Sequence, residues 1–182
     1  MVFFSILVAI VIIQRLIELL YAKRNEKWMK AEGAVEYGSK HYPFIVLLHV
    51  LFFVSILIEG TINEGQTGPG WFFFFLLFIA AQVMRVWALA SLGKFWNTKI
   101  IVLPGENKVA KGPYRWVKHP NYIVVATEIA ALPLIFGAYF TAIVFTILNA
   151  LLLLVVRIPA EEKALTALKQ EQAERKVSVS RE

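Results

Sequence analysis

Twelve residues between two long apolar runs carry the side chains best suited to chemistry. Residues 111–122 read KGPYRWVKHPNY and hold three aromatic rings, four basic or potentially basic side chains and two prolines. The residue before a proline disfavours the α conformation, so we predict a bend at His119, with Pro120 in the first turn of a helix. The His119 ring, the Asn121 amide and free backbone N–H groups then lie at a positive helix N-terminus, which suits an anion such as a carboxylate.

The basic and aromatic residues of this segment also have simpler explanations. Lysines beside a membrane-spanning segment often only fix its orientation, which covers three positions, Lys94, Lys108 and Lys111. Trp116 alone fits the aromatic belt of a membrane interface. These explanations leave the pair His119 and Pro120 unaccounted for, with Tyr114, Trp116 and Tyr122 as flat surfaces beside it.

A second polar cluster, RIPAEEKAL, occupies residues 157–165 after the last apolar run. Taken alone, it fits an arginine that reaches back to the interface, followed by acidic residues that complement a helix N-terminus. We expect Pro159 and Ala160 to step the chain out of the membrane. A polar amphipathic helix then begins at Glu161 and Glu162, with Leu165 and Leu168 on one face.

The composition indicates which elements must position these groups. Of 182 residues, 58% are hydrophobic and 18% are charged, and the mean hydropathy is +0.63, which is typical of membrane proteins. Three apolar blocks are predicted to be spanning helices: Met1–Leu20, Pro43–Ile58 and Trp71–Ala90. The first and third reach the roughly 20 residues that cross ~30 Å of hydrocarbon, and the second does so with its flanks.

The last apolar region, residues 122–156, is too long for one crossing. Pro133 and Gly137 interrupt it, and this pair predicts a tight reversal between two spans at Asn121–Phe136 and Ala138–Arg157. The outer ends of such a hairpin meet on one side of the membrane. His119 and Arg157 should therefore converge, although they are far apart in sequence.

The basic residues predict the orientation. Lys and Arg number five in residues 21–42, none in 60–70, six in 91–122 and six from 157 onward. By the positive-inside rule the basic segments are cytoplasmic and the N-terminus is outside, which requires five spans. The net charge of +6 is then a topology signal, so we expect no nucleic acid partner. The absence of cysteine excludes disulfides and thiolate chemistry, and we expect no metal.

These patterns predict an all-α, polytopic membrane protein with five transmembrane helices. Residues 1–91 would hold three spans and a cytoplasmic loop at 21–42, residues 92–170 the functional region, and residues 171–182 a polar tail. Unpaired charge inside a span is costly, so we expect Arg85 and Glu128 to face the interior and to neighbour each other or Arg15. Arg15 and Glu18, at i and i+3, should pair in the same way.

The segment LGKFWNTKIIVLPGENKVAKGPYRWVKHPNY, followed by a hydrophobic hairpin and RIPAEE, resembles the isoprenylcysteine carboxyl methyltransferase family of integral-membrane enzymes that use S-adenosylmethionine. The resemblance covers Leu92–Leu168, and the two motifs at hairpin spacing are more specific than either alone. The segment RLIELLYAKRNEKWMKAEGAVEYGSKHYP resembles a small bacterial branch whose acceptors are lipophilic, polyketide-like hydroxyls rather than prenylated proteins. Lys118 departs from the family, which usually has arginine there, and lysine lacks the bidentate fork.

The resemblance implies a role for each matching position. The implied cofactor-binding residues are Glu106, Asn107, Lys108, Val109, Tyr114, His119, Pro120, Asn121, Tyr122 and Glu161. Arg157 would face the acceptor and act in catalysis, and Trp87 and Trp96 are further candidates for acceptor contact. The reaction implied is methyl transfer to a carboxylate, or to an acidic enol or phenol, of a lipophilic acceptor that enters from the bilayer. The site would lie on the cytoplasmic face, at the cell membrane if the source is bacterial.

Two alternatives remain at this point. The first is another lipid-modifying membrane enzyme, such as a nicotinamide-dependent reductase of similar architecture, although no G-x-G-x-x-G follows a predicted strand. The second is a non-enzymatic transport or interaction protein, in which charges within the membrane mark an ion path. Against the second, the charges lie near one face rather than along a span.

Overall fold

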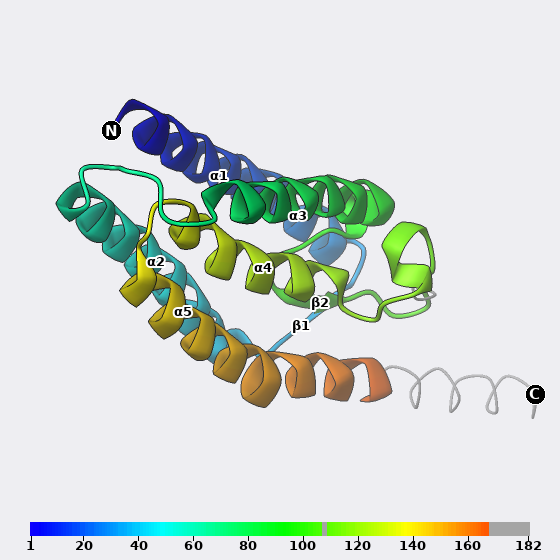
Figure 1. Cartoon of the computed structure of the whole chain (residues 1–182). Helices are drawn as coiled ribbons and strands as arrows, with labels where there is room; N and C mark the ends of the chain where they lie inside the picture. Colours follow the sequence, from blue (N-terminus) through cyan, green and yellow to red (C-terminus); the bar gives the residue numbers. More distant parts are fainter. Residues whose placement is uncertain (107–108, 168–182) are drawn as a thin grey trace, which may run out of the picture.

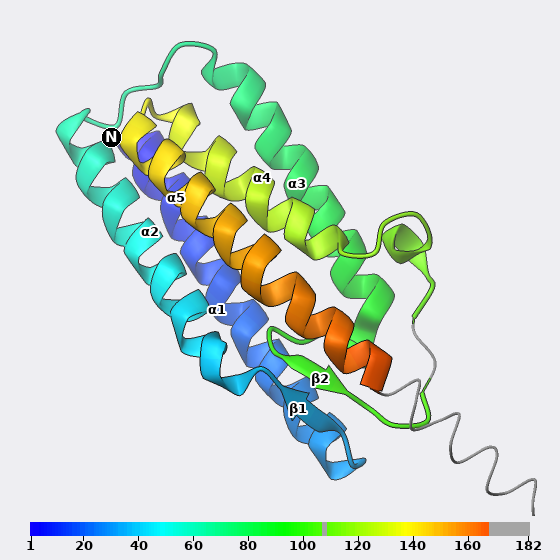
Figure 2. The same cartoon turned by 90° about the horizontal axis from the view of Figure 1, so that it is seen from below.

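Five helices form the body of the molecule (Figure 1). The computed structural model describes residues 1–106 and 109–167. The helices are α1 (Val2–Ala31), α2 (Tyr42–Ile62), α3 (Trp71–Leu92), α4 (Pro120–Ile135) and α5 (Tyr139–Leu151). Viewed from below, α2, α5, α4 and α3 lie in a row, and α1 crosses behind it (Figure 2). Within the described residues four helices are long and apolar enough to cross a membrane, while α4 is a shorter apolar helix. The chain is therefore a mostly helical, multi-pass membrane protein.

Apolar side chains cover the outside of this bundle as well as its inside. Large side chains on α2 are well exposed, among them Phe44, Val50 and Ile58. A helix that is apolar on all faces is stable only in a protein core or in lipid. The inner faces pack a separate core, which includes Phe4, Phe52, Phe78, Leu132 and Phe136.

The predicted hairpin between the last two spans is confirmed. Pro133 lies in the final turn of α4, and Gly137 adopts a φ of +62°, which side chains other than glycine rarely tolerate. The Gly68 N–H donates to the Ile135 carbonyl at 3.0 Å, and a Cβ added at Gly68 would lie 2.9 Å from the Gly137 Cα. Glu59 accepts the Thr141 N–H at 2.8 Å, which caps the start of α5. The reversal is therefore a close-packed corner.

The predicted pairing of charges inside the bundle is also confirmed. Arg85, which is 2% exposed, binds the Glu128 carboxylate through two nitrogens, and its Nη1 lies 3.0 Å from Glu18. Arg15 lies 2.7 Å from both Glu18 and Glu128. Two cations thus face two anions, which removes most of the cost of placing them in an apolar environment. We call these four residues, Arg15, Glu18, Arg85 and Glu128, the ion cluster; it joins α1, α3 and α4.

The structure corrects the prediction for residues 21–42. Residues 21–31 continue α1 instead of forming a loop, supported by the i, i+4 pair of Glu26 and Lys30 at 2.6 Å. The chain also departs from a purely helical fold, because β1 (Val35–Tyr37) pairs with β2 (Ile100–Val102) as a short antiparallel ribbon. Lys99, beside β2, lies 2.7 Å from Glu26 and thereby holds the ribbon against α1.

The expected break at Pro159 is wrong. The helix that begins with α5 continues through a π-helical segment, Leu152–Arg157, and then as α-helix to Ala167. Proline removes one N–H and crowds the carbonyl four residues before it, and a wider turn just upstream accommodates both effects. Leu168 and the predicted tail at residues 171–182 lie outside the described residues.

Candidate active site

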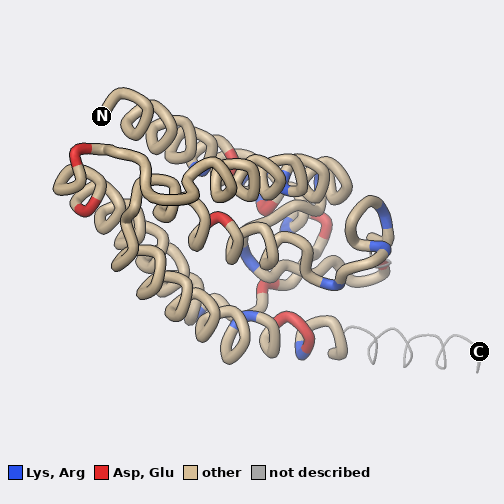
Figure 3. Tube along the Cα trace, in the orientation of Figure 1, with Lys and Arg blue, Asp and Glu red and all other residues tan. Residues whose placement is uncertain are grey.

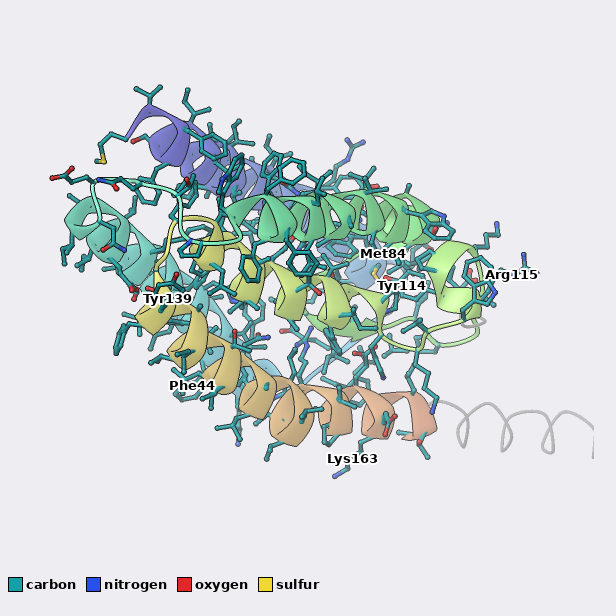
Figure 4. All side chains as sticks on the ribbon, in the orientation of Figure 1. Phe44, Met84, Tyr114, Arg115, Tyr139 and Lys163 are labelled. Atoms are coloured by element: carbon teal, nitrogen blue, oxygen red, sulfur yellow. The ribbon has the colours of Figure 1, made fainter. Side chains whose placement is uncertain are left out.

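The loop before α4 is pressed against the end of α3. Its short helical turn, Gly112–Arg115, begins at Gly112, which has a φ of +55°. A Cβ at this position would lie 2.0 Å from the Ser91 Oγ and 3.0 Å from the Trp87 Nε1. Only glycine allows the backbone at position 112 to lie this close to α3, so Gly112 determines where the loop packs. Tyr114 points toward the bundle, and Arg115 lies on the outer side (Figure 4).

The predicted bend at His119 is confirmed. His119 is the residue before α4, with φ −130° and ψ 63°, and Pro120 is the first residue of the helix. The His119 ring stacks on the Tyr122 ring, with centroids 5.2 Å apart and planes 11° from parallel. The positive end of α4 therefore carries two stacked rings beside the Asn121 N–H, whereas the Tyr122 and Ile123 N–H groups donate to the His119 carbonyl.

The two polar clusters converge as expected from the hairpin. The Tyr122 hydroxyl contacts the Glu161 carboxylate, and His119 Nδ1 lies 3.5 Å from the same carboxylate. The Arg157 Nε donates to the Tyr122 hydroxyl at 3.1 Å. Residues that are 35 to 42 positions apart in sequence thus form one connected set.

Arg157 is fixed from a second side by residues that sequence reasoning missed. It is 6% exposed, and its Nη2 donates to the Thr98 carbonyl at 2.7 Å. The Thr98 hydroxyl lies 3.1 Å from the hydroxyl of Tyr42, at the start of α2. Asn25 holds the preceding loop through the Trp96 carbonyl at 2.8 Å. No residue type signals such contacts, because backbone carbonyls accept most of them.

Two buried polar atoms at the start of α4, His119 Nε2 and Asn121 Oδ1, have no hydrogen-bond partner within the described residues. Other such atoms lie elsewhere, on His41, Trp96, Thr146 and Asn149. Buried polar atoms are nearly always paired, so two unpaired ones at the same helix end favour a ligand site there. Burial and, to a smaller degree, the nearby Glu161 raise the pKa of the Tyr114 phenol, which stays a neutral hydroxyl at physiological pH.

The remaining predicted site residues are arranged around this set. Glu106 is exposed, Val109 is half-buried, and Pro120 is buried under the start of α4. Asn107 and Lys108 lie outside the described residues. Trp96 is buried at 2% exposure, whereas Trp87 packs on Trp116 at 5.6 Å near the surface. Residues 1–106 and 109–167 contain no group of acidic and histidine side chains that could hold a metal.

The basic residues gather on the same side of the molecule. Figure 3 shows Lys and Arg toward the end of the bundle that carries the β ribbon and the start of α4, while the loop between α2 and α3 carries no Lys or Arg and one acidic residue, Glu64. The site therefore lies at the basic end of a membrane-embedded helical bundle.

The fold and this site together define a polytopic membrane protein with a polar site at one end of a helical hairpin. The family model for isoprenylcysteine carboxyl methyltransferases matches residues 74–167, which include the loop, α4 and α5. The chain belongs to this family, which is a family of methyltransferases.

Two relatives extend the similarity over nearly the whole chain. The chain is 48% identical over 162 residues to the uncharacterized protein YpbQ of Bacillus subtilis, covering 89% of this chain and 96% of YpbQ. It is 30% identical over 169 residues to an uncharacterized protein of Haemophilus influenzae, covering 92% and 98% of the two chains. No solved structure matches the chain.

Proposed function

We propose that the protein is an S-adenosylmethionine-dependent O-methyltransferase of the membrane. Its acceptor is lipophilic and carries a carboxylate or an acidic enol or phenol, as in prenylcysteine-like or polyketide-like compounds. The observation that carries the proposal is the convergence of His119, Tyr122, Arg157 and Glu161 at one end of the α4–α5 hairpin. All four residues lie within the part of the chain that matches the methyltransferase family.

The residues at the start of α4 suit the polar groups of S-adenosylmethionine. The Asn121 N–H and His119 Nε2, which has no hydrogen bond within the described part of the chain and lies 4.0 Å from the Glu162 carboxylate, can hold the carboxylate of the cofactor. Asn121 Oδ1 and Glu161 can accept hydrogen bonds from its ammonium or ribose hydroxyls. The stacked rings of His119 and Tyr122, with Tyr114, give electron-rich faces that suit a positive sulfur. When bound there, S-adenosylmethionine would supply an electrophilic methyl group.

Arg157 suits the acceptor. Hydrogen bonds to Tyr122 and Thr98 hold its Nε and Nη2, and the described residues give Nη1 no hydrogen bond. This edge of the guanidinium can bind an acceptor oxygen and keep it ionised. A carboxylate is already ionised and an acidic enol or phenol nearly so, so orienting the oxygen is the main task of the protein.

We also propose five spans, with the N-terminus outside and the site on the cytoplasmic face. The distribution of Lys and Arg supports this orientation (Figure 3). The chain has no cysteine, so single cysteines can report on it without background. Thr67→Cys, in the loop between α2 and α3, should react with an impermeant maleimide in intact cells, whereas Lys40→Cys should react only after permeabilisation. The opposite labelling would reverse the orientation.

The reaction class can be tested directly by measuring which cofactor the protein binds. S-adenosylmethionine should raise the unfolding temperature of the purified protein by stabilising the folded state, while NADPH should not. Protection by NADPH alone would replace the methyltransferase proposal with a reductase.

A further inference from the structure

The hydroxyl of Tyr122 touches both halves of the proposed site. It accepts a hydrogen bond from Arg157 Nε at 3.1 Å and donates to the Glu161 carboxylate. Arg157 is the residue assigned to the acceptor, and Glu161 is assigned to the cofactor. One oxygen atom thus connects groups that serve different substrates.

The ring of Tyr122 is held independently of its hydroxyl. It stacks on His119 and starts from the first turn of α4, just after Pro120. Arg157 and Glu161, by contrast, both belong to the helix that continues α5, one on its π-helical segment and one a turn later. The hydroxyl of Tyr122 therefore has a fixed position on α4, and it contacts two side chains of the helix that continues α5, Arg157 and Glu161.

The two hydrogen bonds strengthen each other. A hydroxyl that donates to a carboxylate carries more negative charge on its oxygen and accepts better from a guanidinium. Both bonds involve a charged partner, and Arg157 is nearly buried, so water competes weakly for it. Loss of the hydroxyl should loosen Arg157 and Glu161 together.

We propose that the Tyr122 hydroxyl is a positioning group that aligns Arg157 with Glu161, and so aligns the acceptor oxygen with the methyl group to be transferred. The inference rests on the proposed function and deepens it. Tyr122 acts through Arg157: the hydroxyl sets the direction of the guanidinium, while the free Nη1 meets the acceptor. Among the hydrogen bonds of the described residues, Arg157 then retains the one to the Thr98 carbonyl when the hydroxyl is removed.

Tyr122→Phe removes the hydroxyl and keeps the ring that stacks on His119. We expect this variant to bind S-adenosylmethionine within about threefold of the parent by titration calorimetry. Its rate of methyl transfer to a lipid extract should fall about tenfold or more, because a charge-assisted contact is lost in the transition state. Tyr139→Phe makes the same chemical change at the far end of α5 and should leave both values unchanged.

A double variant separates alignment from simple loss of packing. If the hydroxyl acts through Arg157, adding Arg157→Lys to Tyr122→Phe should slow transfer by no more than about twofold, although Arg157→Lys alone has a much larger effect. If the decrease in transfer rate of the double variant equals the product of the decreases in the two single variants, Tyr122 and Arg157 act independently. That result would overturn the proposal.

Unfolding of the cofactor-free protein tests the same link without activity. The double variant of Tyr122→Phe and Glu161→Ala should lower the unfolding temperature by less than the sum of the decreases in the two single variants, since both substitutions remove the same hydrogen bond. Additive decreases would overturn the link. Non-additive decreases in a protein that fails to bind S-adenosylmethionine would uphold the link and reject the proposed function instead.

Discussion

At the level of single residues, experiment can decide whether His119 only packs at the membrane interface or also binds the cofactor. His119→Ala removes the stack on Tyr122 in either case, so it should lower the unfolding temperature. A histidine that also holds a cofactor carboxylate loses a charge-assisted contact as well, so the variant should weaken S-adenosylmethionine binding by about tenfold or more. Titration calorimetry of the purified protein decides between the two roles. Unchanged affinity would leave His119 as an interfacial residue.

The roles of Arg157 and Glu161 should differ in kinetics. Arg157→Ala should lower turnover by one to two orders of magnitude, since a charge-assisted contact contributes roughly 1.5–3 kcal/mol, and should leave cofactor affinity nearly intact. Glu161→Ala should first raise the apparent KM for the cofactor. Arg157→Lys should recover only part of the rate, because an ammonium cannot replace a fork held by Tyr122 and Thr98.

Steady-state rates at saturating and limiting cofactor distinguish these outcomes. The reverse pattern, with cofactor binding lost in Arg157→Ala and turnover retained at saturation, would exchange the two roles. The acceptor would then be sought nearer Trp87 and Trp96.

Residue types alone could predict only part of this site. His119 and Glu161 could be placed because a proline and an apolar hairpin determine where they lie. Thr98 could not, because it contributes a carbonyl oxygen that any residue would offer. Tyr42 could not either, since its partner depends on the β ribbon, which brings residues 35–37 beside 100–102.

Among the elements, the loop before α4 depends on Gly112. Gly112→Ala should lower the free energy of unfolding by at least about 2 kcal/mol, because it combines a positive φ with a clash against Ser91. Gly33→Ala is the matched control, since Gly33 has a φ of +88° with open space around it, and it should lose only about 1 kcal/mol. Chemical denaturation measures both, and equal losses would mean that the close approach at Ser91 is unimportant.

The elements themselves differ in how far the sequence could predict them. Pro133 and Gly137 fix the hairpin locally, so its position is correct within a residue or two. The extension of α1 to Ala31 depends on Glu26, Lys30 and Lys99 meeting in space. The continuation past Pro159 depends on a π-helical turn, for which Leu152–Arg157 has no signature in its composition.

At the scale of the whole molecule, the ion cluster joins α1, α3 and α4. Arg85→Met should destabilise the fold by about 3–5 kcal/mol, because Glu128 and Glu18 then face only Arg15. Adding Glu128→Leu should restore part of the loss, since the remaining pair, Arg15 and Glu18, is neutral again. Unfolding in detergent measures both variants. If the double variant is less stable than Arg85→Met, the ion cluster does not stabilise the fold through its charge balance.

Transfer of a methyl group to a lipid-soluble oxygen can be measured directly. The most direct measurement incubates the purified protein in vesicles of total membrane lipid extract with S-adenosylmethionine labelled in its methyl group. We expect label in the lipid phase, strongly reduced with Arg157→Ala and retained with Tyr139→Phe. Alkali would release methanol from a methyl ester but not from an ether, which separates carboxylate from phenol acceptors. Absence of lipid-soluble label, with a folded protein that binds S-adenosylmethionine, would rule out methyl transfer to a lipophilic acceptor.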